Sequence, residues 1–240
     1  MPIVPLFGHE ALRARLEDAA RRGVLPASIL LHGPAGVGKQ RLALELARVL
    51  LCTGTLTGSA ALCGACQSCR FSAELTHPDL HWLFPRPRLK DGDATADEVA
   101  ADFATAVAER VSNHGLYPPP PGNEGIYVAT IRALVRRASV SPALSRRKVF
   151  VVGEAERMVP QEGADQAANA FLKLLEEPPE DTVLLLTSSE PGALLPTIRS
   201  RVVAVRVPPL GADEVRAFVE HPEVRPRVAS GGARGPSTEE

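Results

Sequence analysis

The fold of this chain is decided by the stretch ILLHGPAGVGK at residues 29–39. Its first residues form an apolar run typical of a buried strand, and residues 41–50 after it repeat apolar side chains at helical spacing. Between strand and helix, Gly33, Gly38 and Lys39 match the pattern G-x-x-x-x-G-K of a phosphate-binding loop. An ordinary glycine-rich turn is the alternative, but the strand before the loop and the helix after it favour the phosphate loop.

In such a loop the backbone N–H groups close around phosphate oxygens at the positive end of the next helix, and the lysine reaches the terminal phosphates. The residue after the lysine is normally Ser or Thr, whose hydroxyl holds Mg²⁺, but here a glutamine stands in that place. The predicted nucleotide site consists of Gly33, Pro34, Gly36, Gly38, Lys39 and Gln40.

The overall composition is that of a globular protein. A chain of 240 residues, 45% of them hydrophobic, can bury a core large enough for one large domain and a smaller piece. The formal net charge of -1 provides no global field for nucleic acid, so any DNA contact must come from a local patch. The sequence has no signal pattern and no apolar run near the ~18 residues of a membrane span, so we expect a cytoplasmic protein.

Four cysteines predict a structural zinc site. Three of them follow the pattern C-x-x-C-x-x-C, and a fourth lies upstream, which gives the four thiolates of a closed tetrahedral zinc site. In a reducing compartment such a cluster is typical of metal ligands and not of disulfides. Reduced core thiols are the alternative, but they would not be expected at three-residue spacing in a polar loop. The predicted ligands are Cys52, Cys63, Cys66 and Cys69.

The residues before and after this cluster have the patterns of further helices and strands. Residues 8–22 have the spacing of an amphipathic helix, and the sequence His77-Pro78-Asp79-Leu80 leads into a strand that ends near Phe84. Residues 85–125 change in composition, and we interpret them as an insertion into the parent domain. Residues 95–111 within it form a predicted helix, because Thr95-x-x-Glu98 is a capping-box pattern.

Strands and helices then alternate. Residues 127–138 predict a helix that carries Arg132, Arg136 and Arg137, which either contact DNA phosphate or form a solvated face. Residues 148–152 and 183–186 read as buried strands. This alternation predicts an α/β fold with a parallel sheet flanked by helices, and with the chemistry at the carboxyl ends of the strands.

Two further segments make a family resemblance specific. The sequence NAFLKLLEEPP at residues 169–179 and the sequence PTIRSR at residues 196–201 closely resemble clamp-loader subunits of bacterial DNA polymerase III, the gamma/tau and delta-prime members of the AAA+ ATPases. The phosphate loop, the cysteine cluster, the His77-Pro78-Asp79 triplet and residues 148–158 occur in the family's order. The resemblance covers most of residues 1–207 and implies an AAA+ domain with its zinc module at residues 52–69.

The resemblance also implies roles for single residues. The helix through residues 169–177 would belong to the subunit contact surface. Ser200-Arg201-Val202 resembles the family's Ser-Arg-Cys motif, without its cysteine, and implies that Arg201 reaches into the ATP site of a neighbouring subunit. A surface salt bridge is the alternative for this arginine.

The residues at the magnesium positions distinguish a subunit that hydrolyses ATP (a motor) from one that does not (a stator). A working ATPase of this type holds Mg²⁺ with the Ser or Thr after the loop lysine and with an Asp that ends the second-motif strand. This chain has Gln40 and Gly153 at those positions, and Glu154 at the water-polarising position. A base without its metal cannot neutralise the charge that develops on the phosphates. We therefore expect a delta-prime-type subunit that binds ATP weakly or not at all, holds no Mg²⁺ and does not hydrolyse ATP.

Partners and the chain's end follow from the resemblance. The expected partners are the gamma/tau and delta subunits and, through the complex, the sliding clamp and primed DNA. Residues 208–240 are expected to hold a truncated lid segment, with a helix at residues 213–220, and a disordered tail. Two alternatives stay open: an active gamma/tau-like ATPase in which the Gln40 amide oxygen binds Mg²⁺, and a zinc-bearing interaction protein outside replication.

Overall fold

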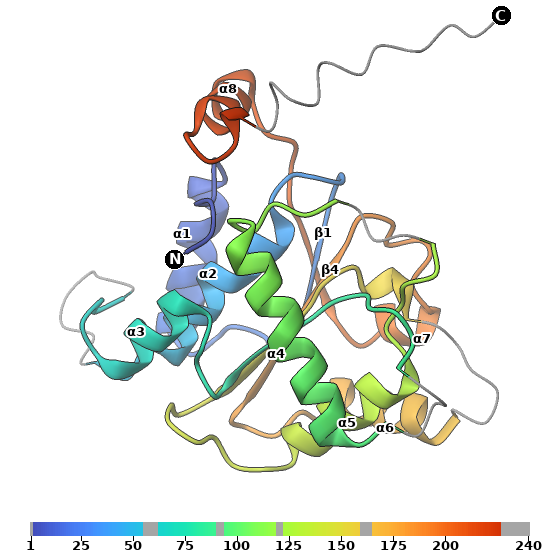
Figure 1. Cartoon of the computed structure of the whole chain (residues 1–240). Helices are drawn as coiled ribbons and strands as arrows, with labels where there is room; N and C mark the ends of the chain where they lie inside the picture. Colours follow the sequence, from blue (N-terminus) through green and yellow to red (C-terminus); the bar gives the residue numbers. More distant parts are fainter. Residues whose placement is uncertain (1, 55–61, 90–93, 119–121, 159–164, 227–240) are drawn as a thin grey trace, which may run out of the picture.

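A five-stranded parallel sheet forms the centre of the protein (Figure 1). The computed structural model describes residues 2–54, 62–89, 94–118, 122–158 and 165–226. The strand order is β2-β3-β4-β1-β5, and every neighbouring pair is parallel. The strands are β1 (Ser28–His32), β2 (Leu80–Leu83), β3 (Lys148–Val152), β4 (Thr182–Ser188) and β5 (Val203–Arg206).

The three central strands make the core. All residues of β3 and β4 are buried, and so are the first four residues of β1. Continuous apolar runs are typical of strands that are covered on both faces. Each fully buried Leu, Ile or Val contributes about 1.5–3 kcal/mol through the hydrophobic effect. The edge strand β5 differs, because Val203 is 50% exposed and most of that strand faces solvent.

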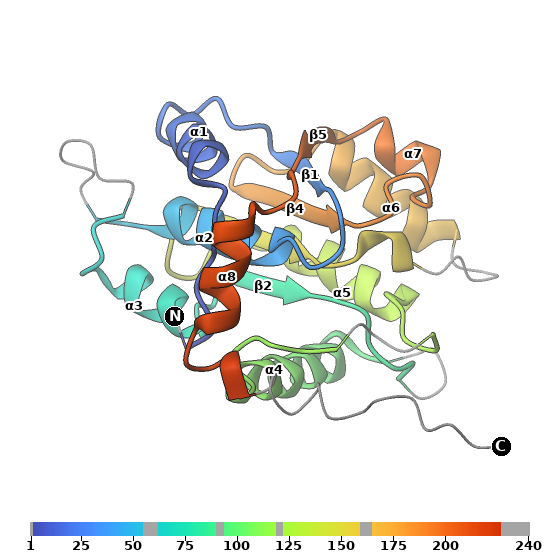
Figure 2. The same ribbon diagram turned by 90° about the horizontal axis from the view of Figure 1, so that it is seen from above.

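Helices cover both faces of this sheet, as Figure 2 shows from above. α2 packs on the central strands with α1 and α3 beside it, while α5 and α6 lie on the opposite face and α4 runs along the β2 edge. Short α7 contacts α6, and α8 follows the last strand. The helices are α1 (Glu10–Arg21), α2 (Lys39–Leu51), α3 (Gln67–Glu74), α4 (Ala96–Ser112), α5 (Val128–Ala138), α6 (Asp165–Glu176), α7 (Pro196–Arg199) and α8 (Ala212–Glu220).

The predicted α/β fold with a flanked parallel sheet is confirmed, with small shifts at the boundaries. The strand at residues 148–152 lies where predicted, whereas β4 extends beyond residues 183–186 and β2 ends one residue before Phe84. The capping box of α4 is present: the Thr95 hydroxyl accepts a hydrogen bond from the Glu98 amide at 3.3 Å, and the Glu98 carboxylate accepts one from the Thr95 amide at 2.8 Å. The expected disordered tail falls largely on residues 227–240, outside the described residues.

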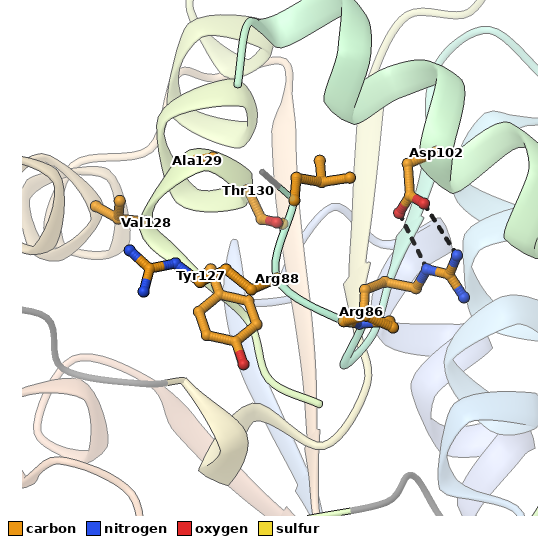
Figure 3. Close-up of a pocket in the computed structure, with 9 residues that line it drawn as sticks. Arg86, Arg88, Asp102, Tyr127, Val128, Ala129 and Thr130 are labelled. Atoms are coloured by element: carbon orange, nitrogen blue, oxygen red, sulfur yellow. Dashed lines mark hydrogen bonds and ion pairs between the residues drawn. The ribbon is translucent and has the colours of Figure 1, made fainter. Parts of the chain in front are cut away.

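The two ends of residues 85–125, the predicted insertion, meet. Arg86 and Gly125 exchange two backbone hydrogen bonds of 3.0 Å, so the segment leaves and rejoins the body at one place. The Arg86 guanidinium also holds the Asp102 carboxylate of α4 with two bonds of 2.9 and 3.0 Å (Figure 3). α4 packs on the body through Phe103, whose ring lies edge-on to Phe84 at 5.4 Å between ring centroids.

Asp79 ties the start of β2 to the loop before β3. Its fully buried carboxylate accepts hydrogen bonds from three backbone amides, those of Ala143, Leu144 and Ser145, at 2.6–2.8 Å. The Ser145 hydroxyl contacts the His77 ring at 3.0 Å. Burial acts to raise the pKa of the Asp79 carboxyl, but the three amides and His77 outweigh it, so this pKa is lowered. The His77-Pro78-Asp79 triplet therefore joins the start of β2 to the loop before β3.

No helix among the described residues is long and apolar enough to span a membrane.

Replacing Asp79 by Asn should destabilise the protein by about 2–3 kcal/mol, because an amide cannot accept all three backbone hydrogen bonds. Since the folded-state pKa of Asp79 is depressed, its stabilisation is complete above the unfolded-state pKa of about 3.9 and is lost as the pH falls through the folded-state pKa. Denaturant unfolding of both proteins between neutral and acid pH measures this. A difference in unfolding free energy that does not shrink below pH ~4 would contradict the assignment.

Candidate nucleotide and metal sites

Lys39 of the phosphate loop, residues 33–39, is bonded to its own loop. The side chain is 7% exposed, and its Nζ donates to the carbonyl oxygens of Gly33 and Pro34 at 2.9 and 2.7 Å and to the Ser189 hydroxyl at 2.9 Å. Burial lowers the pKa of this amine, although Glu156 and Glu154 act to raise it. Since an ammonium group has three protons to donate, these partners use its full capacity.

Other parts of the chain contact the two ends of this loop. The backbone of Val207 passes so close to Gly33 that a Cβ there would lie 2.1 Å from the Val207 carbonyl oxygen. The residues before α1, 2–7, form an N-terminal arm. Gly38, at a φ of 90° that favours glycine, lies under the Leu6 side chain of this arm. The arm continues to Phe7, whose ring lies edge-on to Phe218 of α8 at 5.7 Å. The predicted nucleotide residues are thus brought together; other segments of the chain pack against Gly33 and Gly38, whereas Pro34 and Gly36 are exposed.

Gln40 occupies the space beside Gly153. A Cβ on Gly153 would lie 2.5–2.7 Å from three atoms at the end of the Gln40 side chain, so a larger residue there would require this flexible side chain to move. The Gln40 Oε1 accepts hydrogen bonds from Trp82 Nε1 at 2.9 Å and from Arg110 at 3.2 Å. The two residues that depart from the magnesium-binding pattern therefore fit one another, and the described side chains do not offer the ligand set that Mg²⁺ takes in this type of site.

Two glutamates follow Gly153. Glu154 has a left-handed backbone, with φ 51°, and its amide donates to the Thr187 hydroxyl at 3.2 Å. Burial, followed by the neighbouring Glu156, raises the pKa of its carboxyl. Glu156 accepts a hydrogen bond from the Ser189 amide at 2.9 Å, and its other oxygen is buried without a partner among the described residues. Both carboxylates thus lie at the strand ends, close enough to influence Lys39.

The sequence analysis missed three residues of this site. Ser189 follows β4, and the rule that chemistry gathers at the carboxyl ends of parallel strands could have found it. Trp82 and Arg110 carried no such signal, because their positions depend on how β2 and the insertion helix pack against α2.

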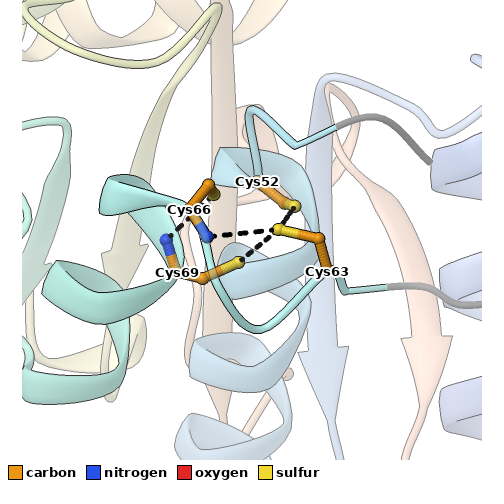
Figure 4. A group of neighbouring side chains, drawn as sticks. All are labelled: Cys52, Cys63, Cys66 and Cys69. Atoms are coloured by element: carbon orange, nitrogen blue, oxygen red, sulfur yellow. Dashed lines mark hydrogen bonds between the residues drawn. The ribbon is translucent and has the colours of Figure 1, made fainter.

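The four predicted zinc ligands come together (Figure 4). Their sulfur atoms all lie within 4.8 Å of one another, with 3.5 Å between Cys52 and Cys63 and 3.7 Å between Cys63 and Cys69. A tetrahedral zinc ion with Zn–S bonds of about 2.3 Å requires sulfur atoms about 3.8 Å apart. The cluster therefore fits zinc in number, type and spacing of ligands.

Backbone amides and a polar contact support this cluster. The Cys66 amide donates to Cys63 Sγ and the Cys69 amide donates to Cys66 Sγ, each at 3.4 Å. Burial acts to raise the pKa of the Cys66 thiol, but hydrogen bonds from Thr53 and the Cys69 amide outweigh it and lower the pKa to about 5. The buried Ser68 hydroxyl contacts Ser145 at 3.0 Å, which links the module to the loop that Asp79 holds.

Arg201 lies at the opposite end of the sheet from the phosphate loop. It precedes β5, whose first residue pairs with Ile29 at the start of β1, whereas the loop follows the end of β1. The Arg201 guanidinium contacts the Glu176 carboxylate at 2.5–2.6 Å and donates to the Thr197 carbonyl oxygen at 2.9 Å. Strands rise about 3.3 Å per residue, so the length of β1 separates Arg201 from its own loop.

The arginines of α5 divide into two groups. Arg137 donates to the His81 ring at 3.3 Å and to the Pro78 carbonyl oxygen at 3.2 Å, so it is engaged inside the chain. Arg132 and Arg136 are exposed. Phosphate contact and a solvated face both stay open for these two.

Comparison with known proteins places the chain in a family. The family model described as "DNA polymerase III, delta subunit" matches residues 8–211. The DNA polymerase III subunit delta' of Pseudomonas aeruginosa is 37% identical over 76% of this chain, and the gamma/tau subunit of Mycobacterium tuberculosis is 34% identical over 82%. This chain spans 43% and 27% of the length of those two proteins.

A solved structure is also similar. A DNA polymerase III gamma subunit-related protein from Thermotoga maritima has 26% sequence identity and a TM-score of 0.48, with 85% of this chain and 49% of that chain covered.

Metal analysis of protein purified without chelator should find about one zinc per chain, because four thiolates close a structural site. Cys63→Ser should lower this content to near zero, whereas Ser139→Ala, at an exposed serine on another element, should leave it unchanged. Zinc should leave the wild-type protein as the pH falls, since ligand thiols must lose their protons to bind. Metal-free protein with four freely reactive thiols would show that the site does not exist.

Proposed function

Because the chain belongs to the family described as "DNA polymerase III, delta subunit", we propose that it serves as the delta-prime-type stator of a clamp loader. In this role it helps to place the sliding clamp on primed DNA as part of a complex with gamma/tau and delta subunits. It holds a structural zinc ion, supplies an arginine to a neighbouring ATP site, and does not hydrolyse ATP itself.

The close fit of Gln40 and Gly153 carries the stator assignment. An ATPase of this type needs a hydroxyl at the first position and a carboxylate at the second to hold Mg²⁺ on the phosphates. In this chain an amide stands at the first position and fills the space of a side chain at the second. Glu154 keeps the place of the water-polarising base, but without the metal it has no means to offset the charge of the transition state.

The position of Arg201 supports a role in trans. Because the length of β1 separates it from its own phosphate loop, it cannot serve the nucleotide of its own chain. A guanidinium suits a neighbour's ATP, since it is always charged and its planar fork matches phosphate oxygens. In the free chain this guanidinium is held by Glu176 and Thr197, which fixes its direction before a partner docks.

The gamma/tau-like alternative requires the Gln40 oxygen to bind Mg²⁺. That oxygen already accepts hydrogen bonds from Trp82 and Arg110, and a carbonyl oxygen has two lone pairs. Metal binding would have to break both bonds and bring a dication beside a guanidinium. The alternative of a zinc-bearing interaction protein outside replication is disfavoured by the family match over residues 8–211.

Arg201→Ala should impair the complex without preventing its assembly. The protein would be co-expressed with the gamma/tau and delta subunits, and DNA-stimulated ATP hydrolysis and clamp loading would be measured. Arginine fingers contribute about 10³–10⁵ in rate elsewhere, but the other ATP sites of the ring keep their turnover, so the bulk loss should be smaller. Arg199→Ala, at an exposed arginine of neighbouring α7, serves as the matched control.

Two outcomes would contradict this proposal. If the Arg201→Ala complex assembles and loads clamps at the wild-type rate, the arginine has no role in trans. If the purified chain alone turns over ATP, and Lys39→Ala abolishes that turnover, the chain is a motor of the gamma/tau type.

A further inference from the structure

Arg110 of the insertion helix places a guanidinium group beside the start of α2. Its central carbon lies 3.3 Å from the ring centroid of Phe84, 3.6 Å from that of Tyr117 and 4.9 Å from that of Trp82. It also donates to the Gln40 Oε1 at 3.2 Å. Cation–π contacts are strongest for a desolvated cation, so the three rings hold this group in place. Two of the rings come from the body and one from the insertion.

This guanidinium stays charged. Burial lowers the pKa of Arg110 to about 10, against the raising influence of Tyr117 and Glu154, so at neutral pH the group is still a cation. Its charge in turn acts to lower the pKa of the Glu154 carboxyl. A fixed positive charge therefore lies beside Gln40, at the first magnesium position, and acts on Glu154, at the water-polarising position.

Residues 114–115, after α4, also contact the N-terminal arm, whose Leu6 side chain packs on Gly38 of the phosphate loop. The Val4 amide of the N-terminal arm donates to the His114 carbonyl oxygen at 2.7 Å, and the His114 ring contacts the Glu223 carboxylate beyond α8 at 2.9 Å. Gly115, at a φ of 73°, lies against Arg41 of α2. One short stretch of the insertion thus contacts the arm, α2 and the segment after α8.

We propose that Arg110 replaces the magnesium ion as the local cation of the nucleotide site. This inference rests on the proposed stator function and deepens it, because it adds to the two changed ligand positions a third residue, distant in the sequence but hydrogen-bonded to Gln40, that excludes the metal. Arg110 excludes the metal by its charge, and Gln40 excludes it by its volume.

The single tryptophan of the chain reports on this arrangement. Trp82 contacts both Gln40 and Arg110, so its fluorescence responds to changes at these two residues. The excited indole can also transfer energy to a bound fluorescent nucleotide. Binding of N-methylanthraniloyl-ATP would be measured with and without Mg²⁺ in a set of variants of the full chain. Melting curves would verify that each variant folds.

The variants separate the effect of the Arg110 charge from the effect of the residue types at positions 40 and 153. Gln40→Thr with Gly153→Asp restores the ligand types of a magnesium site but keeps the Arg110 charge. Adding Arg110→Met removes that charge, whereas adding Arg110→Lys preserves it; Arg136→Met, at an exposed arginine of α5, is the matched control. If the methionine variant does not melt cooperatively, Arg110→Gln replaces it, since it is also neutral.

The charge-free triple variant should bind the nucleotide about tenfold more tightly with Mg²⁺ than without it, which corresponds to ~1.4 kcal/mol. The double variant and the lysine variant should show little dependence on Mg²⁺. Full Mg²⁺ dependence in the double variant, equal behaviour of the neutral and lysine variants, or no Mg²⁺ dependence in a folded neutral variant would each overturn the role of Arg110. ATP turnover by the unmodified chain would instead contradict the proposed function, so the two failures are distinguishable.

Discussion

At the junction between the end of β3 and the start of α2, the end of the Gln40 side chain occupies the space that a Cβ on Gly153 would enter. Because residue 153 is a glycine, the Gln40 amide can stay in that space and accept hydrogen bonds from Trp82 and Arg110. An ATPase of the same fold divides this space between a hydroxyl, a carboxylate and a metal ion. The two departures are therefore structurally compatible, since the glycine leaves open the space that the glutamine side chain occupies.

The parallel sheet brings this junction, the phosphate loop and Ser189 to the carboxyl ends of its strands, although they are far apart in the sequence. Arg201 lies at the amino-terminal ends of the strands, because it precedes β5, whose start pairs with the start of parallel β1. A subunit built this way can lose its own chemistry at one end of the strands and still serve a neighbour from the other end. That division of roles is the physical basis of the stator proposal.

The sequence predicted those features of the structure that depend on interactions between residues close in the chain. The strand, loop and helix around Lys39 follow from an apolar run, glycines and helical spacing, and the Thr95 capping box marks the start of α4. The cysteine spacing predicted a cluster whose sulfur atoms do meet. These features each lie within one short stretch of the sequence, where periodicity and spacing are informative.

Long-range contacts could not be predicted in the same way. Arg110 reads as the basic residue that commonly ends a helix, and only the packing of α4 against β2 reveals its three aromatic partners. Asp79 belongs to a recognisable triplet, yet the loop amides that it binds lie more than sixty residues away. The partner of Arg201, Glu176, stands in a motif that the sequence analysis assigned to subunit contact.

Isothermal titration calorimetry of the unmodified chain with ATP, in the presence and absence of Mg²⁺, tests the central claim most directly. A site whose metal position is filled by Gln40 should give weak or no binding, with the same affinity in both conditions within about a factor of two. An affinity that tightens by about tenfold or more when Mg²⁺ is added would show that the metal still binds, and would contradict the account.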